Sequence, residues 1–422
     1  MIDRIVIKNA NELITCSGFA AKAGKDMNQL GIIYNGAIII EEGMIKAVGE
    51  TKDIVNEDLE KNSIVIDAAN KIVLPGFVDS HTHFVFGGYR AEEYGWRLMG
   101  EDYMSIMKRG GGIANSVRAT REASHNQLLD AGVKRLNSML GFGVTTVEGK
   151  SGYGLDYATE MKQLKVMKEL NEKHPLDIVA TFMGAHSVPD EFKDRADDYI
   201  EYLLEEVLPD VASDQLAEYC DVFCEEGVFS VEQSEKLLVR AKELGFKIKI
   251  HSDEIVDLGG AKFSADMGAV TADHLLMASN EGLERMKERG IIATLLPGTA
   301  FSLKKPYARA RYMIDQGLAV ALASDFNPGS CYSESIPLII ALATLQMNMT
   351  TEEAITALTI NGAAALNRAE NIGSLDVGKI ADIVIHDCPT YHFLSYHIGV
   401  STVETVIKRG QIVLTERKSK LL

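Results

Sequence analysis

The alternation of hydrophobic and polar positions divides the chain into two ends of one kind and a middle of another. Residues 1–72 and 371–422 contain short runs in which apolar and polar residues alternate, such as "RIVIKNA" near the start and "VETVIKRGQIVLTE" near the end. A period of two predicts β-strands with one buried face. Because a pair of strands alone is only marginally stable, we expect both ends to meet in one small β-sandwich.

Residues 73–370 follow a second pattern, in which an apolar run, a polar loop and an amphipathic segment succeed one another. Eight apolar runs predict strands, at residues 73–81, 143–150, 177–186, 219–226, 246–254, 269–275, 290–298 and 318–329. Strands that alternate with helices over this length predict an α/β fold, namely a (β/α)₈ barrel of the TIM type.

The segments between several of these strands have the marks of helices. Apolar residues at positions 161, 164, 167 and 170 share one face of a 3.6-residue helix. Ser230 with Gln233, and Thr350 with Glu353, have the capping-box spacing that begins a helix. These helices support the barrel interpretation.

Charge and composition exclude several classes of function. The formal net charge is −17 at pH 7, which argues against nucleic acid and anionic membrane surfaces as partners. No apolar run approaches the ~20 residues that a membrane helix needs, and the N-terminal residues lack the apolar core of a signal peptide. The five cysteines are scattered along the chain, so we expect reduced thiols, no disulfide framework and a cytoplasmic protein.

Histidines gather at the carboxyl ends of the predicted strands, which form one face of a barrel. Five of the ten histidines lie there, and the eighth strand ends in an acid: His81, His83, His186, His251, His274 and Asp325. Alternate side chains of a strand point the same way, so His81 and His83 share a face. Imidazoles and one carboxylate suit a divalent metal such as Zn²⁺ or Fe²⁺. We therefore predict one metal ion held by His81, His83, His251 and Asp325, with His186 and His274 beside it.

Several motifs resemble the metal-dependent amidohydrolase superfamily, in the same order and over nearly the whole chain. They are "PGFVDSHTH", "HSDE", "ADHL", "ASDFNPG" and "GSLDVGKIADIVI". Members with two metals usually bridge them through a carboxylated lysine that ends the fourth barrel strand. Here that strand ends in "FCEEG", and the nearest lysine, Lys150, ends the second strand. This departure favours a single metal and leaves Glu225 and Glu226 without a role.

Longer segments resemble one family within that superfamily, the imidazolonepropionases. They are "FVFGGYRAEEYGWRLMGEDYMSIMKRGGGIANSVRATREAS", "TVEGKSGYGLD", "FMGAHSVP", "LLPGTAFSL" and "ASDFNPGSC". The resemblance implies hydrolysis of the ring C–N amide bond of 4-imidazolone-5-propanoate to N-formimidoyl-L-glutamate, a step of histidine degradation. It also implies that the protein is a homodimer.

The resemblance and the chemistry of the side chains together suggest catalytic roles. A divalent metal lowers the pKa of bound water, Asp325 can take the water proton and pass it to the leaving nitrogen, and His274 can stabilise the oxyanion. Glu254 can hold or protonate a ring nitrogen of the substrate, or it can orient a metal-binding histidine instead. Which of the three first activates the water stays open, as does the choice among Zn²⁺, Fe²⁺ and Mn²⁺.

Substrate binding is expected in the loops above the strands. Arg90, seven residues after His83, can bind the propanoate carboxylate through two parallel hydrogen bonds. The resemblance implies that Tyr153 and His186 contact the substrate. It further implies that three residues bind the amino-acid portion of the product: Asn327, Gly329 and Ser330.

Two other functions compete with this interpretation. The shared metal motif also occurs in aminohydrolases that deaminate nucleobase-like heterocycles, which release ammonia and leave the ring intact. A non-catalytic homologue that kept only the barrel would have lost Asp325 or a ligand histidine, and none is missing. Arg90 favours the amide hydrolase, because an uncharged base offers no carboxylate to bind.

Overall fold

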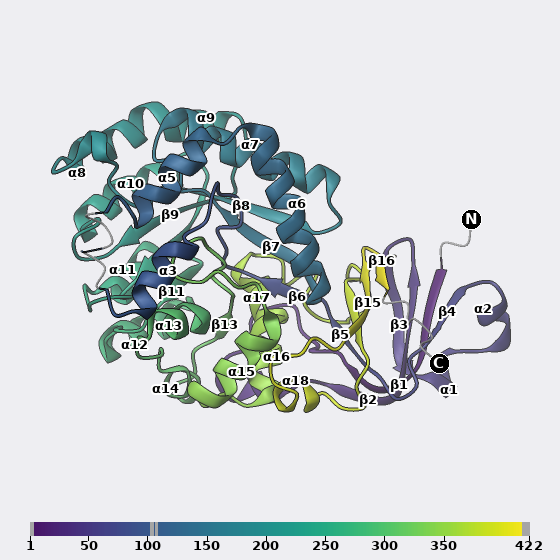
Figure 1. Ribbon diagram of the computed structural model, residues 1–422. Coiled ribbons are helices and arrows are strands. Elements are labelled where there is room, and N and C mark those ends of the chain that lie inside the picture. Colours follow the sequence, from purple (N-terminus) through teal and green to yellow (C-terminus); the bar gives the residue numbers. More distant parts are fainter. Residues whose placement is uncertain (1–3, 102–104, 106–108, 416–422) are drawn as a thin grey trace.

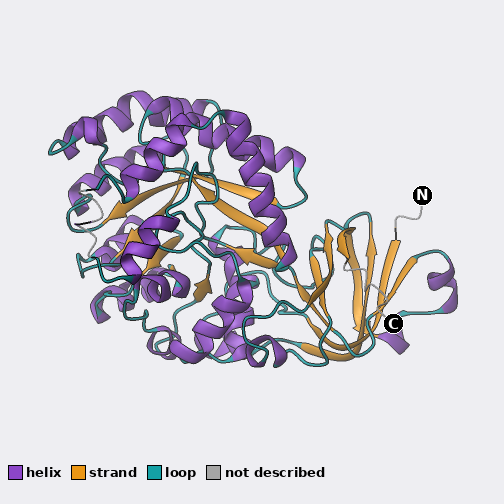
Figure 2. Ribbon diagram, viewed as in Figure 1, coloured by secondary structure: helices purple, strands orange, loops and turns teal. Residues whose placement is uncertain are grey.

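The chain folds into a barrel of parallel strands and a mixed sheet that both ends of the chain enter (Figure 1). The computed structural model describes residues 4–101, 105 and 109–415. Helices surround the barrel, while the mixed sheet lies to one side of it with few helices of its own (Figure 2). The α/β barrel with a β unit built from both termini is therefore confirmed.

The mixed sheet has eight strands in the order β16-β15-β14-β5-β1-β2-β3, with β4 beside β1. Their bounds are β1 (Arg4–Ile14), β2 (Ile32–Glu41), β3 (Met44–Glu50), β4 (Ile64–Asp67), β5 (Ile72–Pro75), β14 (Ile383–His386), β15 (Val403–Lys408) and β16 (Gln411–Thr415). Strand β5 joins the two halves, because it runs parallel to β1 and antiparallel to β14. Short helices lie between these strands: η1 (Gly24–Asn28), α1 (Thr51–Ile54), α2 (Glu57–Lys61) and α18 (Phe393–Tyr396).

The mixed sheet curls around its own apolar core. Ile45 of β3 and Ile407 of β15, from opposite ends of the strand order, belong to one buried cluster with Ile7 and Ile38. A backbone hydrogen bond from the Ile45 N–H to the Lys379 carbonyl (2.9 Å) ties β3 to the segment before β14. Because strands from both ends of the chain contribute to this core, neither end is expected to be stable alone.

The barrel has eight parallel strands in the order β13-β12-β11-β10-β9-β8-β7-β6. Their bounds are β6 (Phe77–Asp79), β7 (Val144–Lys150), β8 (Asp177–Ala185), β9 (Tyr219–Cys224), β10 (Lys247–Ser252), β11 (Thr271–His274), β12 (Ile292–Leu295) and β13 (Val320–Leu322). Each of the eight lies inside a predicted run. The first predicted strand is divided at Gly76, with β5 in the mixed sheet and β6 in the barrel. A Cβ at Gly76 would lie 2.3 Å from Thr145, so the chain crosses between the two sheets where only glycine fits.

The barrel closes between its first and last strands, beyond their formal ends. Thr82 and Phe326 form a parallel bridge. The His83 N–H donates to the Phe326 carbonyl (2.9 Å), and the Asp325 N–H donates to the His81 carbonyl (3.0 Å). The closing seam thus runs through the two segments that carry three of the predicted metal ligands.

Helices follow the strands around the barrel. They are α3 (Ala91–Leu98), α5 (Ile113–Glu122), α6 (His125–Gly141), α7 (Tyr157–Lys173), η2 (Asp190–Phe192), α8 (Ala196–Tyr202), η3 (Leu203–Val207), α9 (Leu208–Ser213), α10 (Val231–Glu243), α11 (Gly260–Met267), α12 (Asn280–Arg289), α13 (Pro297–Leu303), α14 (Ala310–Asp315), α15 (Ile336–Gln346), α16 (Thr351–Leu358) and α17 (Ile360–Ala365). The capping boxes predicted at Ser230 and Thr350 are both present. The predicted apolar face of α7 is buried.

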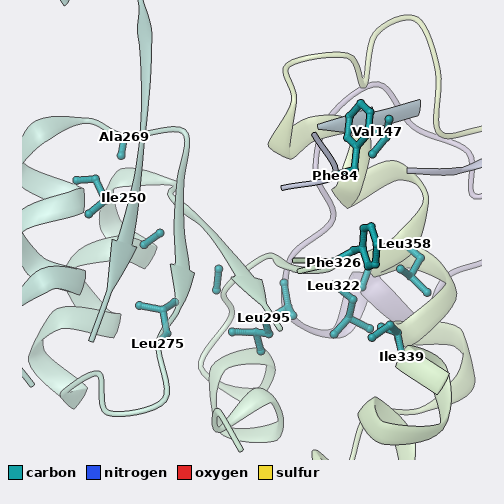
Figure 3. Packing of buried hydrophobic residues seen from close by; sticks show 14 of the residues in the cluster. Phe84, Val147, Ile250, Ala269, Leu275, Leu295, Leu322, Phe326, Ile339 and Leu358 are labelled. Carbon is teal, nitrogen blue, oxygen red and sulfur yellow. The ribbon is translucent and has the colours of Figure 1, made fainter. Parts of the chain in front are cut away.

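The apolar core lies between the strands and the surrounding helices. Figure 3 shows Leu322 of β13 beside Ile339 of α15 and Leu358 of α16, all within the main buried cluster. Because side chains alternate along a strand, apolar residues that face the helices leave the positions between them facing the barrel interior. On β10, for example, Ile250 belongs to the apolar cluster, while its neighbours are Lys249 and His251.

Within residues 4–101, 105 and 109–415, no helix is both long enough and apolar enough to cross a membrane.

Candidate active site

The four predicted metal ligands meet at the carboxyl end of the barrel. Donor atoms of His81, His83 and His251 lie within 4.8 Å of one another, as do those of His81, His274 and Asp325. Asp325 Oδ1 is 3.6 Å from His81 Nε2 and 3.8 Å from His83 Nε2. The side chains of the four predicted ligands and of His274 are all buried. The structure therefore brings together residues that the sequence separates widely.

The chemistry of this cluster fits a divalent metal. Among the described residues, no hydrogen-bond partner reaches the buried Nε2 atoms of His81 and His251. A buried polar atom without a partner costs about 1 to 3 kcal/mol, so two such nitrogens in one place suit coordination to an ion. Three imidazoles and one carboxylate are the donor set that Zn²⁺ and Fe²⁺ accept.

Asp325 is held in place by its backbone and by Thr299. Its φ of +49° is in the left-handed region, a costly conformation for aspartate that often marks functional sites. The Thr299 hydroxyl, from α13, donates to Asp325 Oδ2 at 2.5 Å. Burial raises the pKa of Asp325 to about 7, so a nearby cation would help to keep the carboxylate ionised.

Replacing Thr299 with valine should lower kcat about tenfold to a hundredfold, because a hydrogen bond to a charged group contributes about 1.5–3 kcal/mol. Valine keeps the volume of threonine and removes only the donor to Asp325. Steady-state kinetics would measure the loss, with Thr299→Ser as the matched control that keeps the hydroxyl. Activity within twofold of the wild type in Thr299→Val would contradict the orienting role.

Glu254 and His274 face each other at the edge of the cluster, with 3.7 Å between His274 Nε2 and Glu254 Oε2. Burial raises the pKa of Glu254 to about 8, and the charges of Asp325 and Glu225 act in the same direction. Burial lowers the pKa of His274 to about 4. A protonated carboxyl and a neutral imidazole can both donate hydrogen bonds at neutral pH. This geometry suits the predicted roles at a ring nitrogen and at a carbonyl oxygen.

Tyr153 and His186 line the cluster on another side. The His186 ring stacks on the His83 ring, with centroids 5.0 Å apart. The Tyr153 ring contacts the His186 ring edge-on, with centroids 5.1 Å apart. His186 Nδ1 lies 3.0 Å from the Gly152 carbonyl oxygen. Gly152 has a φ of +99°, and a Cβ there would lie 2.7 Å from the Met183 carbonyl. The "SGYG" motif therefore allows a turn that brings both rings to the metal ligands.

Arg90 lies against the loop that follows Asp325. Its Nε donates to Ser116 Oγ at 2.8 Å, and a Cβ on Gly329 would lie 2.3 Å from one of its terminal nitrogens. Burial lowers the pKa of His186 to about 4, and the Arg90 charge acts in the same direction. Arg90 and Gly329 line a cavity of about 470 Å³.

Asn327 organises the loop that follows Asp325. Its Oδ1 accepts from the N–H groups of Gly329 and Ser330, both at 2.8 Å. Its Nδ2 donates to the Asp325 carbonyl and to Ser330 Oγ, both at 2.7 Å. The Asn327 amide is thus engaged within its own loop, and it fixes Gly329 beside Arg90.

Comparisons with known proteins show the family to which the chain belongs. Residues 72–413 match the model of the amidohydrolase family. An imidazolonepropionase of Clostridium tetani is 61% identical over 409 residues, which cover 97% of this chain and 98% of that relative. An imidazolonepropionase of Parabacteroides distasonis is 56% identical over 411 residues, which cover 97% of this chain and 99% of that relative. The chain belongs to the imidazolonepropionase family of amidohydrolases.

A solved structure shares the fold. An adenosine deaminase from Xanthomonas campestris with bound zinc superimposes with a TM-score of 0.69 at 17% identity, covering 98% of this chain and 93% of that one. At such low identity the likeness concerns the architecture alone. The sequence relatives therefore show the family, and the solved structure shows only that the architecture is shared.

Glu225 has a role in this imidazolonepropionase-family site that its sequence position does not reveal. Its carboxylate accepts from the N–H groups of Glu254, Ile255 and Val256 at 3.0, 2.9 and 3.2 Å. Glu225 thus holds the loop that presents Glu254, whereas Glu226 is exposed. Strand β9 ends at Cys224 and contains no lysine; the single metal ion stays a prediction.

The sequence did not predict three residues that lie against the predicted metal ligands. His81 Nδ1 lies 2.7 Å from Asp273 Oδ2, and His251 Nδ1 lies 3.1 Å from Asp221 Oδ2. Thr299 supports Asp325 in the same way. The two aspartates had a usable signal, since each interrupts an apolar strand of an imidazolonepropionase-family barrel. Thr299 lies in a helix, where no such pattern marks it.

Proposed function

We propose that the chain hydrolyses the ring amide of 4-imidazolone-5-propanoate to N-formimidoyl-L-glutamate. Water adds to the ring carbonyl carbon, the ring C–N bond breaks, and the released nitrogen takes a proton. The observations that carry the proposal are the buried His/Asp donor cluster and the Arg90 guanidinium against Gly329, in the loop that follows Asp325. The cluster suits hydrolysis, and the arginine suits the propanoate group.

His81, His83, His251 and Asp325 would hold one divalent ion. When bound, such an ion lowers the pKa of a water ligand toward neutrality and polarises a carbonyl oxygen. Asp325 accepts the proton of the attacking water and returns it to the leaving nitrogen. His274, neutral at pH 7 because burial lowers its pKa, donates a hydrogen bond to the carbonyl oxygen as negative charge develops there.

Glu254 and Arg90 orient the substrate from opposite ends. Glu254 is protonated near neutral pH, because burial raises its pKa to about 8, and it can donate to a ring nitrogen. Arg90 binds the propanoate carboxylate, and the loop of Gly329 and Ser330 binds the amino-acid portion of the product. Tyr153 and His186 line the space between them, so the ring is held against the donor cluster.

Spectroscopy of the reaction tests the proposal and separates it from deamination. Purified enzyme and fresh imidazolone propanoate should lose the imidazolone absorbance and yield N-formimidoyl-glutamate without free ammonia. Treatment with a chelator should abolish turnover, and added Zn²⁺ or Fe²⁺ should restore it. Ammonia released with the ring intact would instead support the nucleobase-type aminohydrolase, and full activity after chelation would contradict the metal centre.

The proposal also covers the identity of the metal ion, the oligomeric state and the cellular compartment. Zn²⁺ and Fe²⁺ both suit the donor set, and Mn²⁺ is a third option. We expect a homodimer, as the family resemblance implies. All five cysteines are free and buried, which is consistent with our expectation of a cytoplasmic enzyme.

A further inference from the structure

Five charged side chains fill the barrel interior beneath the histidines. They are fully buried and come from four strands: Glu148 and Lys150 of β7, Asp221 of β9, Lys249 of β10 and Asp273 of β11. Charged groups at this depth are rare unless paired, because each loses its hydration. Their retention inside a barrel that could be filled by apolar side chains calls for a function.

Two of these carboxylates lie beside ring nitrogens of the proposed metal-ligand histidines, and Asp221 also accepts from the His251 backbone N–H at 3.3 Å. Asp273 Oδ2 is 2.7 Å from His81 Nδ1, and Asp221 Oδ2 is 3.1 Å from His251 Nδ1. A carboxylate at Nδ1 fixes the proton on that nitrogen and leaves Nε2 as the donor to a metal. The Nε2 atoms of both histidines lack a partner among the described residues, and His251 Nδ1 lies near Asp221 without a hydrogen bond to it.

The same two oxygen atoms also face one lysine. Lys150 Nζ is 2.6 Å from Asp221 Oδ2 and 3.6 Å from Asp273 Oδ2. Its third contact is Glu148 Oε1 at 3.1 Å, and Glu148 Oε2 in turn binds Lys249 at 2.8 Å. Lys150 therefore stands between the carboxylate that orients His81 and the one that orients His251.

We propose that Lys150 is a positioning residue that links the two histidine-holding carboxylates and so sets the orientation of His81 and His251 for the metal. Without the ammonium group, Asp221 and Asp273 would face each other and Glu148 across a buried space, and their repulsion would turn them away from the rings. The inference rests on the proposed function, because it takes His81 and His251 as metal ligands.

The test is the affinity of the folded protein for Zn²⁺ alone, measured by competition with a chromophoric chelator. Lys150→Met should raise the Zn²⁺ Kd about tenfold to a hundredfold, as the loss of an outer partner commonly does. The matched control is Lys408→Met. Lys408 is also a buried lysine between two carboxylates, at 2.6 Å from Asp382 and 2.8 Å from Asp177, but it lies in the mixed sheet.

The control separates positioning from general destabilisation. Lys408→Met should keep the wild-type Kd within about twofold, even where its melting temperature falls as far as that of Lys150→Met. An unchanged Kd in Lys150→Met, or an equal loss in Lys408→Met, would overturn the inference. His251→Ala tests the underlying metal site: if it leaves the Zn²⁺ Kd unchanged, the proposed ligand set fails rather than the role of Lys150.

A second set of variants applies if Lys150→Met does not fold. Asp221→Asn and Asp273→Asn should each weaken Zn²⁺ binding. The double variant should lose less than the product of the two single effects, because losing either carboxylate already releases Lys150 from the other. Losses that multiply independently would show that the two carboxylates act separately, and would overturn the link through Lys150.

Discussion

Asp325→Ala is expected to lower kcat by about 10⁴-fold, since it removes a proton-transfer group and a metal ligand together. Asp325 lies within 4 Å of both His81 and His83 and takes a hydrogen bond from Thr299. Alanine leaves the Thr299 hydroxyl without its acceptor and removes the carboxylate beside the two imidazoles. Steady-state kinetics would measure the fall in turnover, and metal analysis of the purified variant should show reduced metal content.

A buried carboxylate elsewhere provides the control for this substitution. Asp382, immediately before β14, is buried and paired with Lys408. Asp382→Ala should lower stability and leave the kcat of the folded protein close to normal. More than a tenth of wild-type turnover in Asp325→Ala would refute both its ligand role and its proton-transfer role.

Arg90→Met is expected to raise KM about a hundredfold or more with a smaller change in kcat, because the carboxylate loses its charged partner before and during the reaction. Arg90 has Ser116 at its Nε and Gly329 against its terminal nitrogens, so the guanidinium is fixed rather than free in solvent. The KM of Arg90→Lys should lie between those of the wild type and of Arg90→Met, because lysine keeps the charge but cannot form two parallel hydrogen bonds with the carboxylate. Initial rates across a range of substrate concentrations would give both constants.

A modified substrate shows whether the effect of Arg90 concerns the carboxylate. Wild-type enzyme should strongly prefer the propanoate over an imidazolone that carries an uncharged propyl group, and Arg90→Met should lose that preference. Arg97, which lines the same cavity, supplies the matched control, and Arg97→Met should change KM by less than about threefold. An unchanged KM in Arg90→Met would mean that another group binds the propanoate.

Local patterns in the sequence were sufficient to predict the architecture. Period-two alternation identified the strands of both ends, and the capping boxes at Ser230 and Thr350 marked real helix starts. Histidines at predicted strand ends were sufficient to predict the cluster, because a parallel barrel places all carboxyl ends on one face. These features depend on neighbours in the sequence and on one rule of topology.

The features that escaped prediction depend on contacts between distant segments. Gly76 divides a continuous apolar run because of Thr145, which no local pattern reveals. Glu225 holds the backbone around Glu254 from a different strand end, and Thr299 reaches Asp325 from a helix. A side chain that serves another residue in this way carries no periodic mark of its own.

We expect the ligand set to assemble late in folding. It depends on two backbone hydrogen bonds, which join Asp325 to His81 and His83 to Phe326. The first and last strands must dock across nearly the whole barrel sequence before His81, His83 and Asp325 share a site, and contacts of such long range form slowly. An ion that binds only the docked arrangement stabilises it by mass action. Helices α16 and α17 pack against both β6 and β13, but among the described residues these two strands are joined by an isolated bridge rather than a continuous ladder. Metal uptake would therefore stabilise the closed barrel at this seam, and loss of the ion would weaken it.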